Sequence, residues 1–107
     1  MPKNRFLPIL AALALSSSLV LAKPPAAITY SGGDGSTIEK AVIINGGTEE
    51  TGVHAEYAYI QKHYPGYKRG GQSLLNQQGR DYDAIEFRTA DGKKMTIYFD
   101  ITAFFGK

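Results

Sequence analysis

One segment of the chain carries its apolar side chains at the spacing of an α-helix. Four residues recur at steps of four, three and four, which places them on one face: Val53, Tyr57, Ile60 and Tyr64. Thr48 precedes this run as an N-cap, with two glutamates in the first turn, and Pro65-Gly66 follows it as a stop signal. The pattern predicts an amphipathic helix from about residue 49 to residue 64.

The remaining apolar residues form short runs that are typical of β-strands. Residues 41–44 (AVII) end at Asn45-Gly46-Gly47, and strands are also predicted over residues 72–77, 81–89 and 93–102. Residues 36–39 (STIE) fit a capping pattern and predict one helical turn before the first strand. This order predicts an α+β fold in which one amphipathic helix packs on a mainly antiparallel sheet of about four strands (β-α-β-β-β).

The last predicted hairpin has two possible registers. A two-residue turn on Asp91-Gly92 would place charged side chains on the inward face, whereas a three-residue bulged loop with a left-handed Gly92 pairs Phe87 with Met95 and Ile85 with Ile97. We therefore expect the bulged loop. The opposite face then carries more polar residues that meet solvent: Ala84, Glu86, Arg88, Lys94, Thr96 and Tyr98.

The N-terminus has the three parts of a secretory signal peptide. A basic start is followed by a 17-residue apolar run, residues 6–22, that ends in Val20-Leu21-Ala22. This run is shorter than the roughly 20 residues of a spanning helix. We predict a cleaved signal at residues 1–22, an extended lead-in at 23–30 and a single small α+β domain at 31–107, located in the periplasm or secreted, with no stable membrane insertion after cleavage.

The composition limits the classes of possible partner. The chain has 12 basic and 10 acidic residues, and removal of the signal takes away Lys3 and Arg5, so the mature part is formally neutral. A neutral exported domain does not have the concentrated basic face of a nucleic-acid binder. Because the chain has no cysteine, it also forms no disulfide, and its stability has to come from packing.

The glycine-rich stretch at residues 31–37 (SGGDGST) invites comparison with phosphate-binding loops. No lysine precedes its Ser/Thr pair, and the third glycine of a dinucleotide fingerprint is replaced by Ile38. A calcium loop would need more oxygen ligands than this stretch supplies. We interpret it as a structural turn that leads into the first strand.

The titratable residues offer few catalytic arrangements. His54 and His63 are nine residues apart, which places them on opposite sides of the helix, so they form no common metal site, and no metal or cofactor is expected. The predicted register places Asp83 beside Phe99 on the inward face and Asp100 near Tyr82. General acid/base chemistry through His63 or the Asp83/Asp100 pair remains open as an alternative.

The segment at residues 64–71 (YPGYKRGG) is the strongest candidate for a binding site. It places two tyrosines, a lysine and an arginine in a glycine-flanked loop, a composition that suits an envelope protein or an anionic glycan. The predicted contact residues are Tyr64, Tyr67, Lys68, Arg69, Arg88 and Tyr98. The alternative is a helix-stop loop in which the tyrosines pack inward and the charges are solvated.

Several segments together resemble a group of small secreted proteins of Gram-negative bacteria. The similarity is carried by SGGDGST, EKAVII, ETGVHAEYAYIQKHYPGYK, YDAIEF and IYFDITAFFGK, which span nearly all of the mature chain. The resemblance implies an exported protein, but it implies no activity, cofactor or site residue. A helix followed by antiparallel strands is also loosely similar to periplasmic inhibitor-like modules of the PepSY type, in fold alone.

These observations favour an exported, non-enzymatic binding module of the bacterial envelope. The alternatives are a small hydrolase or lyase that acts on envelope material, and a purely structural envelope protein. No nucleic-acid partner is expected, because the domain is exported.

Overall fold

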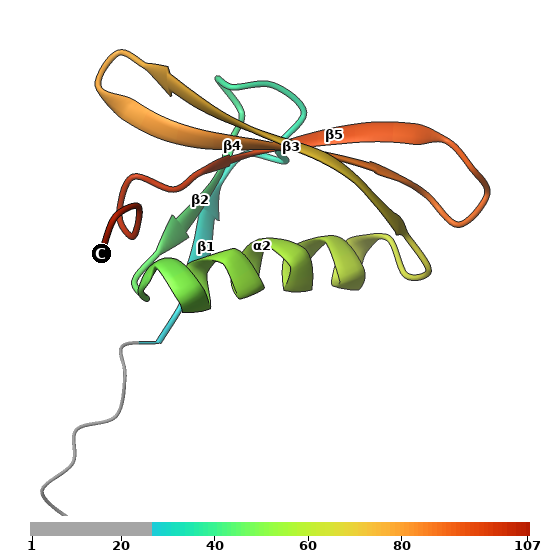
Figure 1. Ribbon diagram of the computed structural model, residues 1–107, viewed down its shortest axis with the longest axis horizontal. Coiled ribbons are helices and arrows are strands. Elements are labelled where there is room, and N and C mark those ends of the chain that lie inside the picture. The colour runs from blue at the N-terminus through green and yellow to red at the C-terminus, as the bar shows by residue number, and fades with distance from the viewer. Residues whose placement is uncertain (1–26) are drawn as a thin grey trace, which may run out of the picture.

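A single helix lies along one face of a five-stranded mixed sheet in the computed structural model, which describes residues 27–107 (Figure 1). The strands are β1 (Thr29–Gly32), β2 (Val42–Asn45), β3 (Lys68–Gln77), β4 (Arg80–Arg88) and β5 (Lys94–Asp100), and the helix is α2 (Glu49–His63). The sheet order is β1-β2-β5-β4-β3, with β2 parallel to β5 and the other neighbours antiparallel. The predicted signal peptide, residues 1–22, lies outside the described residues.

The start of α2 is capped as the sequence predicts. Thr48 is the N-cap and accepts a hydrogen bond from the Thr51 backbone amide, while the Thr51 side chain accepts one from the Thr48 amide. The helix ends at His63, with Tyr64 as its C-cap. Because both ends satisfy part of their unpaired backbone groups, the segment is helical despite Gly52 in its second turn.

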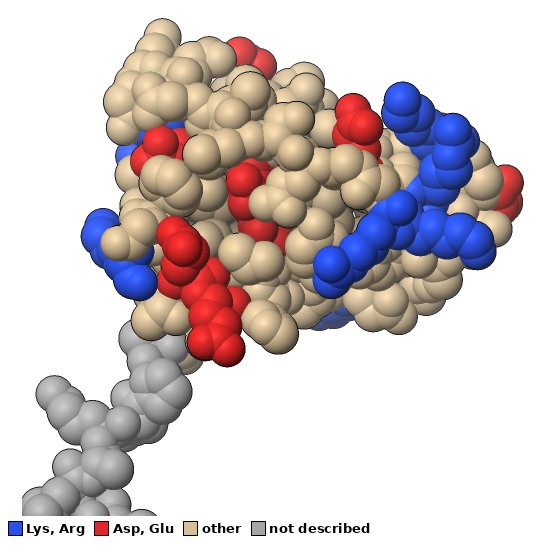
Figure 2. Space-filling view, viewed as in Figure 1, with Lys and Arg blue, Asp and Glu red and all other residues tan. Residues whose placement is uncertain are grey.

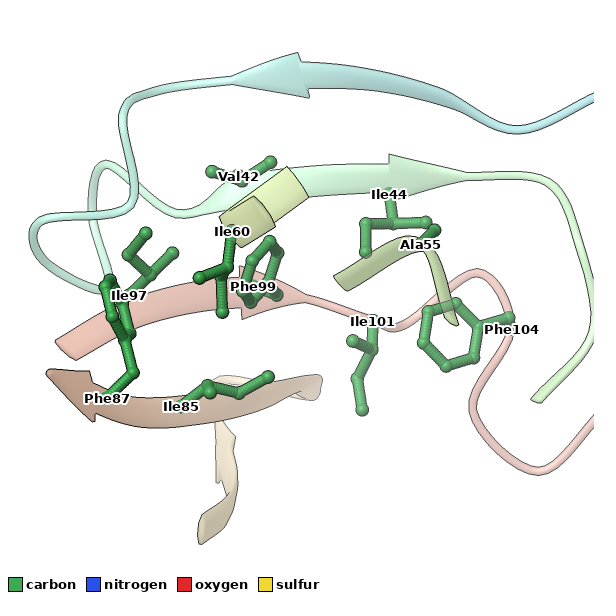
Figure 3. Packing of buried hydrophobic residues seen from close by; sticks show 10 residues of the cluster. All are labelled: Val42, Ile44, Ala55, Ile60, Ile85, Phe87, Ile97, Phe99, Ile101 and Phe104. Atoms are coloured by element: carbon green, nitrogen blue, oxygen red, sulfur yellow. The ribbon is translucent and has the colours of Figure 1, made fainter. Parts of the chain in front are cut away.

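The core lies between α2 and the inward face of β2, β5 and β4 (Figure 3). Aromatic side chains supply much of it: Phe87, Phe99 and Phe104 are each at most 1% exposed. The face of α2 that enters the core differs in part from the predicted one, since its buried residues are Gly52, Ala55, Glu56 and Ile60. Gly52 has to be small, because a Cβ there would lie 2.4 Å from the Phe104 ring.

The register of the β4–β5 hairpin confirms the bulged turn. Phe87 pairs with Met95 and Ile85 with Ile97, and Thr89 donates its backbone N–H to the Lys93 carbonyl. Gly92 has a φ of +92°, the left-handed conformation that the bulge requires. The alternation of inward and outward residues along β4 and β5 is therefore the one expected from the sequence.

The prediction of about four strands is wrong, because the sheet has a fifth strand at its edge. β1 occupies Thr29–Gly32, part of which was assigned to the extended lead-in and part to the glycine-rich stretch. All four of its residues are exposed, so no buried alternation marked it in the sequence. It pairs with β2, and the Tyr30 hydroxyl donates to the Ala55 carbonyl of α2, which attaches the strand to the helix.

The glycine-rich stretch is a turn between two strands, in line with its structural interpretation. Its first two residues end β1, and residues 36–39 form bends and a turn instead of the predicted helical turn. Asp34 accepts hydrogen bonds from the amide and hydroxyl of Ser36. Gly35 crosses the edge of β5 so closely that a Cβ would lie 2.5 Å from Ile97. This contact accounts for a glycine at that position.

Two further predicted boundaries are corrected. β3 begins at Lys68, four residues before the predicted start at residue 72, so the second half of the YPGYKRGG segment is strand rather than loop. The predicted strand at 93–102 ends at Asp100. Of the two phenylalanines that follow, Phe104 packs into the core and Phe105 remains 39% exposed.

Candidate functional site

Three cationic side chains form a row across the outward face of the sheet. Lys68 of β3 pairs directly with Arg88 of β4, which pairs directly with Lys94 of β5. Residues that pair directly point to the same face, and neighbouring strands lie about 5 Å apart. The row, defined as Lys68, Arg88 and Lys94, therefore presents three positive charges within roughly 10 Å along the strand-to-strand direction.

The surface beside this row is hollowed by glycine. A hollow of about 370 Å³ is lined by the three cations together with Arg69, Gly70, Glu86 and Phe87. β3 carries a bulge between Arg69 and Gln72, and at Gly70 a Cβ would lie 2.8 Å from the Glu86 carbonyl oxygen. The two glycines of the bulge thus bring β3 close to β4, and the Arg88 guanidinium donates to the Gly92 carbonyl of the adjacent turn.

The row has few acidic neighbours to neutralise it. Within the part of the chain that the structure describes, Arg80 and Asp100 form the one ion pair within 4.0 Å, and it lies elsewhere on the sheet. Glu86 is the carboxylate in the hollow, and Asp91 in the adjacent turn hydrogen-bonds to Thr89. Figure 2 shows that Lys and Arg side chains gather at the end of the molecule where the β4–β5 hairpin and the start of β3 lie.

The structure separates the predicted contact residues into two groups. Lys68 and Arg88 lie side by side in the row, and Tyr98 lies on the same outward face, four residues along β5 from Lys94. Tyr64 and Tyr67 instead pack on the inward side, with ring centroids 5.1 and 5.9 Å from that of Phe87. The rings of the two tyrosines therefore pack against the core, as in the alternative interpretation in which the tyrosines of this segment point inward.

Arg69 also points to the helix side. Its guanidinium lies over the Tyr57 ring, 3.8 Å from the centroid, and the Tyr57 hydroxyl donates to the Gln72 side chain. Because successive strand residues point to opposite faces, Arg69 cannot join the row that Lys68 begins. Sequence reasoning missed Lys94 as a site residue, although the hairpin register already places it opposite Arg88.

Asp83 and Asp100, considered as a catalytic pair, lie on opposite faces of the sheet. Asp83 pairs with Phe99 and faces α2, whereas Asp100 pairs with Tyr82 and faces outward. Burial on its own would raise the pKa of Asp100, but the hydrogen bonds from Arg80 and Thr102 outweigh it and hold the pKa below its usual range. Asp100 is therefore an ionised structural carboxylate, and the two aspartates share no site.

Asp83 has a different acidic neighbour, which sequence reasoning missed. Glu56 of α2 is fully buried, and neither of its carboxylate oxygens has a hydrogen-bond partner among the described residues. Burial and the nearby Asp83 raise the pKa of Glu56 to about 10, so this side chain is neutral at pH 7. A signal was present, because Gly52, Glu56 and Ile60 are spaced by four residues and lie on one stripe of the helix.

The two histidines remain on the surface. His54 and His63 are both exposed, and the His63 ring stacks against Tyr59 with a centroid distance of 4.2 Å. Among the described residues, no helix is long and apolar enough to cross a membrane.

Comparison with known proteins gives no relative from which a role could be transferred. The chain matches no protein-family model, no curated protein and no solved structure at a significant level. Any inference about its function therefore rests on the geometry of the row and of the buried carboxylates.

Proposed function

We propose that the protein is an exported, non-enzymatic binding module whose cationic row engages an anionic glycan of the cell envelope. The row supplies the contact, through Lys68, Arg88 and Lys94. Export is proposed from the signal-like residues 1–22 and places the module in the periplasm or outside the cell.

The single observation that carries this proposal is the direct pairing of like charges. Opposed like charges on neighbouring strands are destabilising, by up to about 1 kcal/mol for each pair. Lys68–Arg88 and Arg88–Lys94 are two such pairs, and neither has an ion-pair partner among the described residues. An anion that bridges the row would relieve both repulsions, so the free surface is complementary to a series of negative charges.

The chemistry around the row favours a glycan over a protein partner. The centres of protein interfaces are rich in aromatic and apolar side chains. The large apolar side chains that the described residues expose, Tyr30, Leu74 and Phe105, do not line the hollow of the row. A polar, hydrated chain of carboxylate, phosphate or sulfate groups matches the row better, and Arg88 supplies a planar fork of donors for such groups.

Binding to a model polyanion tests this function. The purified protein is titrated with heparin oligosaccharide and with neutral dextran of similar length, and affinity is measured by calorimetry at low salt. Heparin is expected to bind and dextran is not. The double substitution Arg88→Gln with Lys94→Gln removes two of the three charges and is expected to weaken heparin binding at least tenfold, since each charged hydrogen bond contributes about 1.5 to 3 kcal/mol.

A matched control separates the row from overall charge. Lys40→Gln with Lys107→Gln also removes two charges, at exposed positions outside the row, and is expected to keep the affinity within about threefold. Equal weakening by the two double substitutions would show that binding depends on net charge and would refute the row as the site.

A further inference from the structure

A second hollow lies on the other face of the sheet, between the start of α2, β3, β4 and the C-terminal segment. Its volume is about 250 Å³, and its walls are apolar: Val53, Leu74, Ile101, Phe104 and Phe105. Leu74 and Phe105 are 55% and 39% exposed, so the hollow opens to solvent between them. Glu49 and Gln72 complete the lining, and the Glu49 carboxylate accepts a hydrogen bond from the Gly106 amide.

Asp83 is the buried acidic side chain of this hollow, whereas Glu49, which also lines it, is exposed. It is 4% exposed and lines the cavity, and it forms no ion pair among the residues the structure describes, its acidic neighbour being Glu56. Buried carboxylates are normally paired, because an uncompensated charge in the interior is costly. Asp83 therefore has no cationic partner within the described chain, although the protonated Glu56 can donate a hydrogen bond to it.

The neighbouring Glu56 does not supply the missing positive charge. It is completely buried, it does not line the hollow, and both of its oxygens lack hydrogen-bond partners within residues 27–107. Since Glu56 stays protonated at neutral pH, it offers no counter-charge to Asp83. Arg69, the cation on this side of the sheet, is placed over the Tyr57 ring and forms no ion pair.

The shape and chemistry of the hollow define its ligand. A buried carboxylate in a cavity binds a cation that carries hydrogen-bond donors. Apolar walls favour an aliphatic chain attached to that cation. Ca²⁺ and Mg²⁺ prefer six or more oxygen ligands and would gain nothing from walls of Val53, Leu74 and Phe104. A volume below the usual 300 to 1,000 Å³ of small-molecule sites suits one side-chain-sized group.

We propose that this hollow is a binding site for a primary alkylammonium group, with the ammonium on Asp83 and a short aliphatic chain between the apolar walls. The ammonium would come from a free aliphatic amine or from a lysine side chain of a peptide. The site lies on the opposite face from the cationic row and rests on Asp83, so it stands or falls independently of glycan binding.

Nuclear magnetic resonance with a minimal probe tests the site. The full protein, labelled with ¹⁵N, is titrated with n-butylammonium, and amide shifts around Asp83, Leu74 and Phe104 are followed. Saturable shifts confined to these residues are expected, whereas 1-butanol, the uncharged analogue, is expected to cause none. The same titration with Nα-acetyl-lysine amide distinguishes the sources, because it binds comparably if a lysine side chain fits and more weakly if the hollow excludes the backbone.

Two substitutions assign the binding to its proposed parts. Asp83→Asn removes the charge with little change in shape and is expected to weaken n-butylammonium binding at least tenfold. Glu56→Gln keeps Asp83 and is expected to stay within about threefold of the unmodified protein. Phe105→Ala removes an exposed part of the wall without entering the core, and is expected to weaken binding by a smaller factor even if Asp83→Asn fails to fold.

The inference is overturned by either of two results. One is the absence of saturable shifts at the hollow up to 100 mM n-butylammonium, about the weakest affinity expected of a five-atom ligand. The other is equal binding of n-butylammonium and 1-butanol, which would show that the apolar walls act alone.

Discussion

The buried carboxyl of Glu56 makes the stability of the protein depend on pH in a defined way. The pKa of Glu56 is about 10 in the folded protein and 4.5 when the side chain is unperturbed. Between these values the folded state holds one proton more than the unfolded state, so the free energy of unfolding falls as pH rises. The full stability is present below pH 4.5 and is lost progressively up to about pH 10.

The size of the effect follows from this proton difference. One proton corresponds to about 1.4 kcal/mol for each pH unit, so this group alone lowers the free energy of unfolding by about 4 kcal/mol between pH 5 and pH 8. That loss is a large part of the 5 to 15 kcal/mol that stabilises a typical domain. Glu56→Gln mimics the neutral acid, and its amide can donate to Asp83, so the variant is expected to lose this pH dependence.

Urea unfolding followed by far-ultraviolet circular dichroism measures the difference. At pH 5 and pH 8 the free energy of unfolding is determined for the unmodified protein, for Glu56→Gln and for Glu50→Gln, an exposed glutamate of the same helix. The advantage of Glu56→Gln over the unmodified protein is expected to grow by about 4 kcal/mol between the two pH values, and that of Glu50→Gln by less than about 0.5 kcal/mol. Asp83, the carboxylate facing Glu56 from β4, adds to the effect of burial on this pKa, so Asp83→Asn is expected to lower the pH at which the loss of stability ends. An advantage of Glu56→Gln that is constant with pH would refute the assignment of Glu56 as a buried neutral acid.

Two further substitutions test the packing of Gly52 against Phe104 and the role of the Asp100 carboxylate. Gly52→Ala improves helix propensity by about 1 kcal/mol. It is nevertheless expected to lower the free energy of unfolding by about 1 to 3 kcal/mol in urea titrations, because its Cβ would meet the Phe104 ring at 2.4 Å. A stabilised variant would contradict this packing. Thr102→Val removes a 2.7 Å hydrogen bond to Asp100 and is expected to cost about 1.5 to 3 kcal/mol at pH 7. Because the pKa of folded Asp100 is lowered, this cost should shrink as pH falls below the usual range of an aspartate, and a cost that persists unchanged at pH 2 would contradict the role of the charge.

Local patterns were sufficient to predict α2 and the β4–β5 hairpin. The helix has an N-cap at Thr48 and a stop at Pro65-Gly66, and both signals act within a few residues. In the hairpin, only one register keeps Phe87, Met95, Ile85 and Ile97 on one face, so burial selects it. These elements are specified by their own residues.

The edges of the sheet depend on contacts that the sequence pattern does not show. β1 has four exposed residues and is anchored by the hydrogen bond from Tyr30 to Ala55, which joins positions 25 residues apart. The start of β3 is a glycine-containing polar segment that lacks strand propensity and is extended because it pairs with β4. Tertiary pairing therefore decides both edges.

The two candidate sites were hidden for the same reason. Arg88 and Lys94 were both predicted on the outward face, but the third charge, Lys68, joins the row only once β3 begins at that residue. Glu56 was not identified as a site residue, because an acidic side chain in the core is rare. A pattern of apolar residues cannot identify a site whose important members are charged and buried or paired across strands.

The salt dependence of heparin binding shows whether the three charges of the row contact the glycan. A surface that neutralises three anionic groups releases counterions, so a plot of log affinity against log salt concentration is expected to have a slope of about −2 to −3 for the unmodified protein. Arg88→Gln with Lys94→Gln is expected to reduce the magnitude of that slope by about 2, while Lys40→Gln with Lys107→Gln leaves it unchanged. A slope near zero for the unmodified protein would contradict the assignment of the row, Lys68, Arg88 and Lys94, as the glycan-binding surface. The same slope in both double variants would also contradict it.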